Sequence, residues 1–400
     1  MDIQMGKVEL SWQPILIISI ITVLLGVTQY FALRSIRPLF LKWKWVRIIL
    51  ILTAIATTFL IPYNVWLVRG LDVSEQGVAS EFSHFWLGLI IYWIIIFSLL
   101  FLSSRVLYVK KSIRSKIGKD GSRREFFQKV LGGTSLGLTG LVGVTGYGLA
   151  KADPAVENVE IKLRRFPKEL DGYRIVQISD LHIGPIIQRH HVERVVDMVM
   201  ELRPDLIALT GDFVDGSIEQ LADAVLPLSR LQCTGGVFFV SGNHDVFSGW
   251  KIWSNKFREL GITVLENGHV EIKHPAVNES FYILGINDPT AVRLGMQSDV
   301  RMALKGCDPN KAKILLAHQP RSVSQAEQFD IDLQLSGHTH AGQMWPFGWL
   351  VGFLQPYVKG LHQHSNRLQI YVNRGTGFWG PPMRIPYTPE ITSIVVRSIE

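Results

Sequence analysis

The sequence of 400 residues predicts a mixed α/β layered domain preceded by an α-helical transmembrane region. Four uncharged, mostly apolar stretches precede residue 151, and such stretches are typical of membrane spans. From about Asp153 to Glu400, short β-branched and aromatic runs alternate with amphipathic stretches, which is typical of strands alternating with helices. The hydrophobic content of 47% excludes a disordered chain. The two cysteines, Cys233 and Cys307, are far apart and exclude a disulfide-dense module and a cysteine zinc ribbon.

The apolar stretches cover about residues 15–33, 48–68, 85–104 and 130–150. Each is close to the ~20 residues that cross ~30 Å of hydrocarbon at ~1.5 Å per residue. The alternative is buried core helices, but a helix of a soluble protein should show a polar face over this length, and the first three stretches show almost none. We predict a three-span transmembrane anchor over residues 1–121 and a fourth hydrophobic segment, richer in glycine and threonine, over residues 122–152.

The fourth segment begins with Ser122-Arg123-Arg124-Glu125-Phe126-Phe127 and ends with Ala150-Lys151-Ala152. An arginine pair, a nearby phenylalanine, a weakly apolar core and a small-residue end resemble a twin-arginine export signal with a processing site. The twin-arginine export machinery is then an expected partner. The alternative, an ordinary arginine pair in a basic loop next to a membrane, stays open.

Loop charges predict the orientation of the spans. The first loop, from Arg34 to Arg47, holds five basic residues and no acidic one, the second loop is net −2, and residues 105–129 hold nine basic and two acidic residues. Because Lys and Arg stay on the cytoplasmic side, the first and third loops are predicted inside and the N-terminus outside. If the fourth segment also crosses, everything after Ala150 lies outside. The prediction is a multi-pass cell-membrane protein with an extracytoplasmic domain.

The charge distribution argues against nucleic acid as a partner. Residues 1–130 carry 16 basic and 7 acidic side chains, whereas residues 131–400 carry 25 and 27. A nucleic-acid-binding face should lie on the folded domain that uses it, but the excess of positive charge lies in the first third of the chain.

The second part of the chain is predicted to alternate buried strands with helices. The predicted strands are residues 173–179, 206–210, 237–241, 281–286, 314–317 and 333–336, and the predicted helices are residues 192–202, 219–231 and 250–260. A repeated strand and helix implies an α/β layered domain, in which ligands gather beyond the carboxyl ends of the strands.

Polar residues follow five of these predicted strands. Asp180 and His182 follow the first, Asp212 and Asp215 the second, Asn243, His244 and Asp245 the third, His318 the fifth, and His338 and His340 the sixth. Carboxylate, imidazole and amide donors without a thiolate suit manganese, iron or zinc. We expect the pairs at i and i+2 to point in one direction because side chains alternate along an extended chain. One such fragment alone is commonly a turn or a structural histidine, but five in order are hard to explain as turns.

These five blocks, D-x-H, G-D-x-x-D, G-N-H-D, a lone H and G-H-x-H, resemble the calcineurin-like metallophosphoesterase family over roughly residues 170–400. The resemblance implies a layered β-sandwich (α/β/β/α) domain over residues 153–400. Four short motifs are similar to the membrane-associated bacterial YkuE/YaeI-like branch of that family: Ala341-Gly-Gln343, Tyr371-Val-Asn-Arg374-Gly375-Thr-Gly377, Pro382-Met-Arg384 and Pro389-Glu390-Ile391.

The resemblance also implies two divalent metal ions, of manganese, iron or zinc. The first set of ligands would be Asp180, His182 and His340, the second Asn243, His318 and His338, with Asp212 as the bridge between the ions. An anion between two divalent cations offsets their repulsion, and a bridging hydroxide would be the nucleophile.

The remaining residues of the second and third blocks receive roles from the same resemblance. His244 would protonate the leaving oxygen, Asp245 would orient the ring of His244, and Asp215 would lie outside the ligand shell. The alternative for His244, a further metal ligand, is disfavoured because seven other positions already fill two sites.

The implied function is a membrane-anchored phosphoesterase that hydrolyses a phosphodiester, a pyrophosphate or a phosphomonoester on a lipid- or envelope-linked substrate. Two alternatives stay open: a membrane metal-binding sensor, and a pyrophosphatase of the UDP-diacylglucosamine type facing the cytoplasm. Arg374 and Arg384 either hold a second phosphate or pair with a buried acid. The aromatic segment 344–357 covers the site, dips into the bilayer surface, or folds onto the domain's own core.

Overall fold

The computed structural model describes residues 12–36, 43–67, 73–112, 121–274, 277 and 279–399. The chain divides into two compact units, which are Met1–Leu71 with Phe82–Val144, and Asp72–Glu81 with Thr145–Glu400. We call them the helical unit and the α/β unit. The domain boundaries expected at residues 121 and 152 remain predictions.

Four long helices make up the first part of the chain: α1 (Trp12–Ile36), α2 (Lys44–Leu67), α3 (Val73–Ser112) and α4 (Gly121–Lys151). Within the helical unit, polar groups join α1 to α2, because Gln29 Nε2 donates to Thr58 Oγ1 over 3.0 Å and Thr57 Oγ1 donates to Gln29 Oε1 over 3.1 Å. Hydrogen bonds of this kind hold apolar helices together where water is absent.

One helical stretch among the described residues, Gly77–Ser103, is long and apolar enough to cross a membrane. Crossing by this helix and by the other three remains a prediction. The arginine pair expected to direct export falls in α4. Several loop charges behind the predicted orientation, among them Arg37, Lys42 and Arg69, lie outside the described residues.

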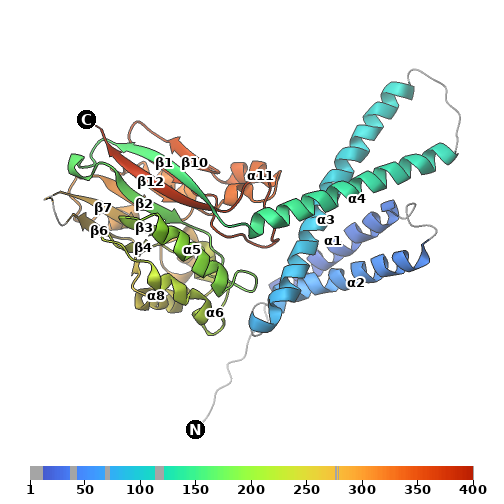
Figure 1. The fold of residues 1–400 in the computed structure, drawn as a ribbon, viewed down its shortest axis with the longest axis horizontal. Coiled ribbons are helices and arrows are strands. Elements are labelled where there is room, and N and C mark those ends of the chain that lie inside the picture. Colours follow the sequence, from blue (N-terminus) through green and yellow to red (C-terminus); the bar gives the residue numbers. More distant parts are fainter. Residues whose placement is uncertain are drawn as a thin grey trace, which may run out of the picture. The chain divides into compact units, whose positions relative to one another are not determined.

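The α/β unit contains two six-stranded sheets (Figure 1). In spatial order, the first sheet holds β1 (Ala155–Leu163), β12 (Glu390–Ser398), β2 (Tyr173–Ile178), β3 (Leu206–Leu209), β4 (Val237–Phe239) and β5 (Thr263–Val264). The second holds β10 (Gly360–Gln363), β11 (Gln369–Val372), β9 (Leu333–Ser336), β8 (Lys313–Leu316), β7 (Ser280–Gly285) and β6 (Gly268–Lys273). The predicted mixed α/β class is confirmed.

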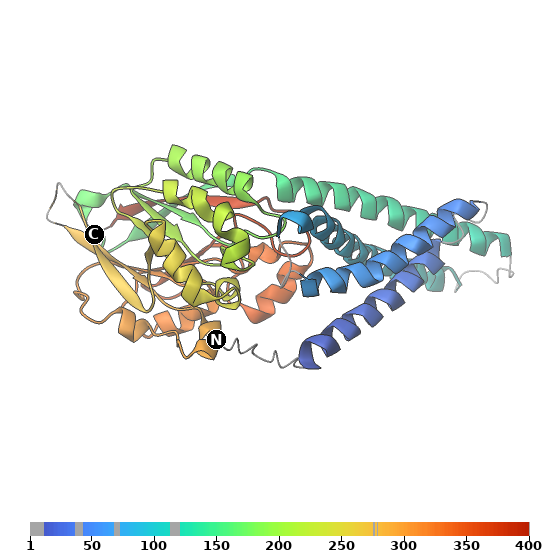
Figure 2. The same ribbon diagram turned by 90° about the horizontal axis from the view of Figure 1, so that it is seen from below.

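Alternation along the strands builds the layers. In β3, Leu206 and Ala208 face the second sheet, whereas Ile207 and Leu209 pack with helices α5 (Arg189–Glu201), α6 (Ile218–Val225) and α8 (Trp250–Glu259). Those helices lie along the first sheet in both ribbon views (Figures 1 and 2). The outer face of the second sheet packs on α9 (Val300–Ala303) and α10 (Val323–Ala326). The order is therefore helix, sheet, sheet, helix.

The six predicted strands are present as β2, β3, β4, β7, β8 and β9, with ends shifted by at most two residues. The predicted helix over residues 219–231 is shorter, because α6 gives way to a 3-10 helix at Leu226–Arg230, where Pro227 removes a backbone donor. Strand β1 was missed because its sequence, AVENVEIKL, places charged residues at exposed positions, so it is not an apolar run.

Parallel pairing brings the polar strand ends together. Strands β2, β3 and β4 are mutually parallel, as are β7, β8 and β9. The carboxyl ends of parallel neighbours meet at one edge of a sheet. Each polar motif of the sequence follows one of these strands, so the fold concentrates them.

Candidate metal centre

Six of the predicted ligands gather in two clusters, and a third grouping connects these clusters through Asp212 and His182. Candidate ligand atoms of Asp180, His182 and His340 lie within 4.8 Å of one another, and so do those of Asp212, His318 and His338. A third grouping, made of His182, Asp212 and His244, links the two. Asp212 therefore lies within reach of both clusters.

Close contacts between ligand atoms mark the centre of each cluster. In the first, Nε2 of His340 lies 3.0 Å from Nε2 of His182 and 3.3 Å from Oδ1 of Asp180. In the second, Nε2 of His318 lies 3.0 Å from Oδ2 of Asp212. Two imidazole nitrogens 3.0 Å apart are spaced as two ligands of one divalent ion with bonds of ~2.1 Å. Asp180 is fully buried and Asp212 is 2% exposed.

Asn243, the first residue of α7 (Asn243–Phe247), offers an amide oxygen that is suited to a divalent metal ion. Its Oδ1 is buried and accepts no hydrogen bond from any group among the described residues. Buried polar atoms are nearly always paired, so this amide oxygen suits a cation. With imidazole and carboxylate donors and no thiolate, the set fits manganese, iron or zinc.

Backbone conformation, and not strand alternation, aims the ligands. Asp180 and His182 converge on one cluster, as expected for residues at i and i+2, whereas His338 and His340 belong to different clusters. The extended chain ends expected at these pairs are absent, because β2 and β9 end at Ile178 and Ser336, before the ligands begin. The ligands adopt the left-handed conformation, with φ of 53° at Asp180, 50° at His182, 56° at Asp212, 71° at His338 and 50° at His340. Such angles are strained in non-glycine residues and cluster at functional sites.

Two glycines allow the turns to approach the carboxylates. A Cβ at Gly242 would lie 2.1 Å from Oδ1 of Asp212, and a Cβ at Gly337 would lie 2.2 Å from Oδ2 of Asp180. No side chain fits at either position. Glycine at these two positions therefore leaves room for the carboxylate of a predicted ligand.

Asp245 does not orient the ring of His244, and that prediction is wrong. Its two carboxylate oxygens accept backbone N–H groups from Gly242 and Asp212 over 2.8 Å each, from Phe213 over 2.9 Å and from Val214 over 3.2 Å. Burial and the nearby charge of Asp212 raise the pKa of Asp245 to about 7, although the amide donors oppose the shift. Asp245 ties the loop that carries Asp212 to the start of α7.

Asp215 orients the ring instead. Its Oδ1 lies 2.6 Å from Nδ1 of His244, and its Oδ2 lies 2.9 Å from Nδ1 of His182. Burial lowers the pKa of His244, but the hydrogen bond and charge of Asp215 outweigh it and raise that pKa to about 9. The same two histidines hold the pKa of Asp215 below its usual range against its burial. One carboxylate thus positions both a predicted ligand and the predicted acid.

We expect Asp245→Asn to unfold more easily, because one of its oxygens becomes an amide group that faces backbone donors. The buried unsatisfied groups should cost about 3 kcal/mol and lower the unfolding midpoint of the full chain by roughly 6–12 °C. Thermal unfolding in detergent measures this, with Asp223→Asn as the control, since the Asp223 side chain is 76% exposed. An unchanged midpoint together with lost activity would restore the ring-orienting role.

The two C-terminal arginines are engaged with the protein itself. Nε of Arg374 lies 2.6 Å from Oε2 of the buried Glu390. Of the two roles predicted for Arg374, the structure therefore has the pairing with a buried acid. Arg384 is fully buried and donates to the carbonyl groups of Arg374 and Gly377, and its Nη2 lies 3.2 Å from Nδ1 of His340. The sequence left two roles open for Arg384, binding a substrate phosphate or pairing with a buried acid. It did not predict that the Arg384 side chain packs against His340, a predicted ligand.

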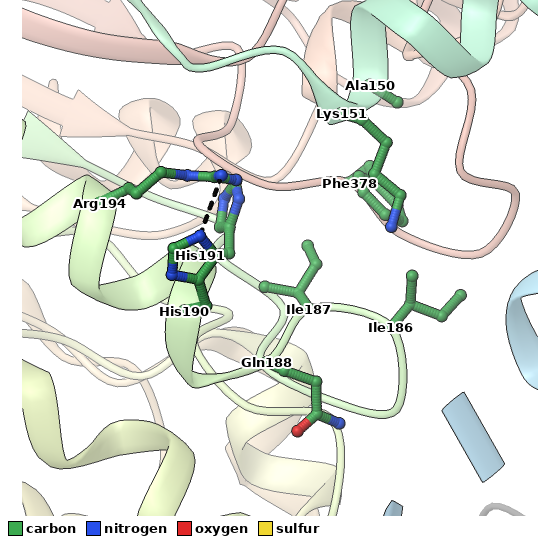
Figure 3. Close-up of a pocket in the computed structure, with 9 residues that line it drawn as sticks. All are labelled: Ala150, Lys151, Ile186, Ile187, Gln188, His190, His191, Arg194 and Phe378. Atoms are coloured by element: carbon green, nitrogen blue, oxygen red, sulfur yellow. Dashed lines mark hydrogen bonds between the residues drawn. The ribbon is translucent and has the colours of Figure 1, made fainter. Parts of the chain in front are cut away.

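A small cavity of about 180 Å³ lies elsewhere in the α/β unit, with Ile187, His191 and Phe378 in its wall (Figure 3). It contains none of the predicted ligands. Its cations already have acidic partners, since Lys151 pairs with Glu81 over 2.6 Å and Arg194 with Asp153 over 3.2 Å. The cavity therefore has no unpaired cation to offer an anionic ligand.

His191 in this cavity should make stability depend on pH. Burial and the nearby charge of Arg194 lower its pKa to about 4. Between pH 6.5 and 4 the unfolded chain therefore binds a proton that the folded chain does not, so stability falls as the pH falls, by about 2 kcal/mol. Between pH 7 and 4.5 the unfolding midpoint should fall about 4–8 °C further for the wild type than for His191→Gln. Equal falls would contradict the assignment.

Similarities to known proteins are found in sequence and in structure. The sequence profile of the calcineurin-like phosphoesterase family matches residues 173–342. The "Transmembrane protein with metallophosphoesterase domain" of Danio rerio is 39% identical over 279 residues, which are 68% of this chain but only 63% of that protein. The "Uncharacterized metallophosphoesterase YkuE" of Bacillus subtilis is 32% identical over 289 residues, covering 70% of this chain and 99% of that protein. A solved dimetal phosphatase from Danio rerio aligns with a TM-score of 0.34 and 14% identity, over 52% of this chain and 88% of that chain.

Proposed function

The chain belongs to the calcineurin-like phosphoesterase family, and on that premise we propose that it is a membrane-anchored phosphoesterase with two divalent metal ions. The bond hydrolysed would be a phosphodiester, pyrophosphate or phosphomonoester of a lipid- or envelope-linked substrate. The observation that carries the proposal is the position of Asp212 within reach of two histidine-containing clusters. A carboxylate shared in this way suits a bridge between two cations.

The protein would hold one ion with Asp180, His182 and His340 and the other with Asn243, His318 and His338, and Asp212 would contact both. Divalent ions at such a site lower the pKa of bound water and offset the charge that develops on phosphoryl oxygens. The buried carboxylates of Asp180 and Asp212 would reduce the net charge of the two ions. The orientation of His182 is maintained by Asp215, which is 2.9 Å from its Nδ1.

His244 would act as the proton donor. Its Nδ1 is engaged with Asp215, so its other ring nitrogen is left to face a substrate. Against its burial, the hydrogen bond and charge of Asp215 raise the pKa of His244 to about 9, which favours the protonated ring. A proton held on Nε2 would pass to the leaving oxygen as the phosphorus–oxygen bond breaks. The ring of Trp379, with its centroid 5.4 Å from that of His244, limits the freedom of the imidazole.

Membrane anchoring is supported by the apolar helix Gly77–Ser103 and by the transmembrane name of the Danio rerio relative. We propose, further, a multi-pass anchor and an extracytoplasmic α/β unit exported through the twin-arginine machinery, as loop charges and the arginine pair indicate. A reporter fused after Glu400 tests this. Activity on the outer side supports the proposal, whereas cytoplasmic activity favours a pyrophosphatase of the UDP-diacylglucosamine type.

The activity itself is tested with the full chain in detergent, stripped of metal with a chelator and reloaded with manganese. Substrates are bis-p-nitrophenyl phosphate, p-nitrophenyl phosphate and a lipid pyrophosphate. We expect hydrolysis to disappear on stripping and return on reloading. Two bound ions without hydrolysis of any of the three would favour the metal-binding sensor. The sensor is disfavoured by the His244–Asp215 pair, because a closed structural site has no need of a proton donor beside it.

A further inference from the structure

Helix α11 (Phe347–Leu354) is an apolar helix with no buried residue. Trp349 is 72% exposed, Phe353 85% and Leu354 77%. Nearby, Trp345 is also exposed. Isolated apolar side chains on a surface are ordinary, but a contiguous aromatic and aliphatic patch marks a contact surface. The expected alternative of a loop folded onto the domain's own core therefore does not apply to this helix.

The base of α11 is held firmly beside the candidate metal centre. A Cβ at Gly342 would lie 2.2 Å from Cα of Gly348, so the helix packs directly on the turn that carries His340. Upstream of the helix, the N–H of Trp345 donates to the carbonyl oxygen of Ile385 over 2.9 Å. The outward side chains are thus presented on a fixed support at the edge of the site.

The segment around α11 is uncharged, and basic residues lie at its border. Residues 344–357 contain no charged side chain. At the far end of the helix, the N–H of the exposed Arg321 donates to Oε1 of Gln355 over 3.0 Å. Lys359 lies 3.7 Å from the centroid of the Tyr387 ring. An apolar, tryptophan-bearing tip with cations at its border matches the interface of an anionic bilayer.

The route of the chain favours the same occupant. At the end of α4, the carbonyl oxygen of Gly146 accepts the N–H of Arg384 over 2.9 Å. A Cβ at Gly146 would lie 3.2 Å from Cδ1 of Ile385, the residue whose carbonyl accepts Trp345. The segment Arg384–Ile385 therefore contacts both the end of α4 and the residue Trp345, which lies just before α11. This keeps α11 close to the residues with which the α/β unit resumes after Val144.

We propose that α11 inserts its exposed side chains into the interfacial layer of an anionic bilayer, and so presents the metal centre to the phosphate of a lipid headgroup. The insertion stands independently, whereas the choice of a lipid substrate rests on the proposed phosphoesterase activity. A second copy of the chain is a weaker occupant, because eight residues of helix span only ~12 Å and stable protein interfaces bury ~800 Å² on each partner.

The first experiment locates the helix in the full chain, reconstituted in nanodiscs that contain phosphatidylglycerol. In a Cys233→Ser/Cys307→Ser background, Phe353→Cys carries an environment-sensitive fluorophore, and lipids with a nitroxide near the headgroup act as quenchers. We expect at least twofold quenching at this position. The control is Ile252→Cys on α8, an apolar residue 56% exposed, which should not be quenched.

Two results of this experiment would overturn the insertion. A label quenched by aqueous iodide but not by the lipid nitroxide would place α11 in water. A label protected from both quenchers would place it against protein, either a second copy or another part of this chain.

The second experiment tests the substrate with the double variant Trp349→Ser/Phe353→Ser. Turnover of soluble bis-p-nitrophenyl phosphate should stay within twofold of the wild type, while kcat/KM for a phosphoester lipid in the same nanodiscs falls about tenfold, mainly through KM. Ile252→Ser serves as the control. Equal losses on both substrates would overturn the lipid assignment. A wild type inactive on every substrate would refute the proposed activity, and the quenching would still decide the insertion.

Discussion

Asp212→Asn should lower kcat by about 10³-fold or more and reduce the number of bound divalent ions below two. Asp212 lies in two of the three metal-ligand groupings among the described residues and is 2% exposed. Although burial opposes ionisation, the neighbouring His318 keeps the pKa of Asp212 below its usual range, so the carboxylate is charged. Asparagine has nearly the same shape but no charge to offset two cations.

The measurement is metal content by elemental analysis alongside hydrolysis of bis-p-nitrophenyl phosphate by the full chain. Asp223→Asn removes the same charge from a side chain that is 76% exposed, and it should retain both metal and activity. A fully active Asp212→Asn, or an inactive one with two ions bound as in the wild type, would exclude the bridging role.

His244→Gln should lower kcat by about 10²–10⁴-fold for an alkyl phosphoester and much less for a p-nitrophenyl ester. The difference arises because p-nitrophenolate departs without a proton, whereas an alkoxide needs one. Metal content should remain that of the wild type, since Nδ1 of His244 is engaged with Asp215 and the two predicted ligand sets do not include His244.

Comparing kcat for the two leaving groups, with metal content measured on the same samples, checks this assignment. His190→Gln is the matched control, because the His190 side chain is 79% exposed. Equal losses on both leaving groups would argue against proton donation, and a loss of metal would make His244 a ligand.

The sequence alone determined the fold class and which residues gather at the candidate metal centre. Short apolar runs, such as the one that forms β3, are visible because a strand buried on both faces has to be apolar throughout. The ends of parallel strands meet at one edge of a sheet, so residues as distant as Asp180 and His318 could be placed together from the strands that precede them.

The tertiary structure alone decided what each side chain contacts. Asp215 and Asp245 both follow strands, and the family resemblance implied Asp245 as the residue that orients the ring of His244. In the structure, the left-handed turn at Asp212 and the start of α7 direct the carboxylate of Asp245 to four backbone N–H groups. The imidazole ring of His244 contacts Asp215 instead. Likewise, composition marked the aromatic segment, but only packing showed α11 exposed. Composition and spacing set which elements form, whereas side-chain direction depends on backbone angles and on neighbours distant in sequence.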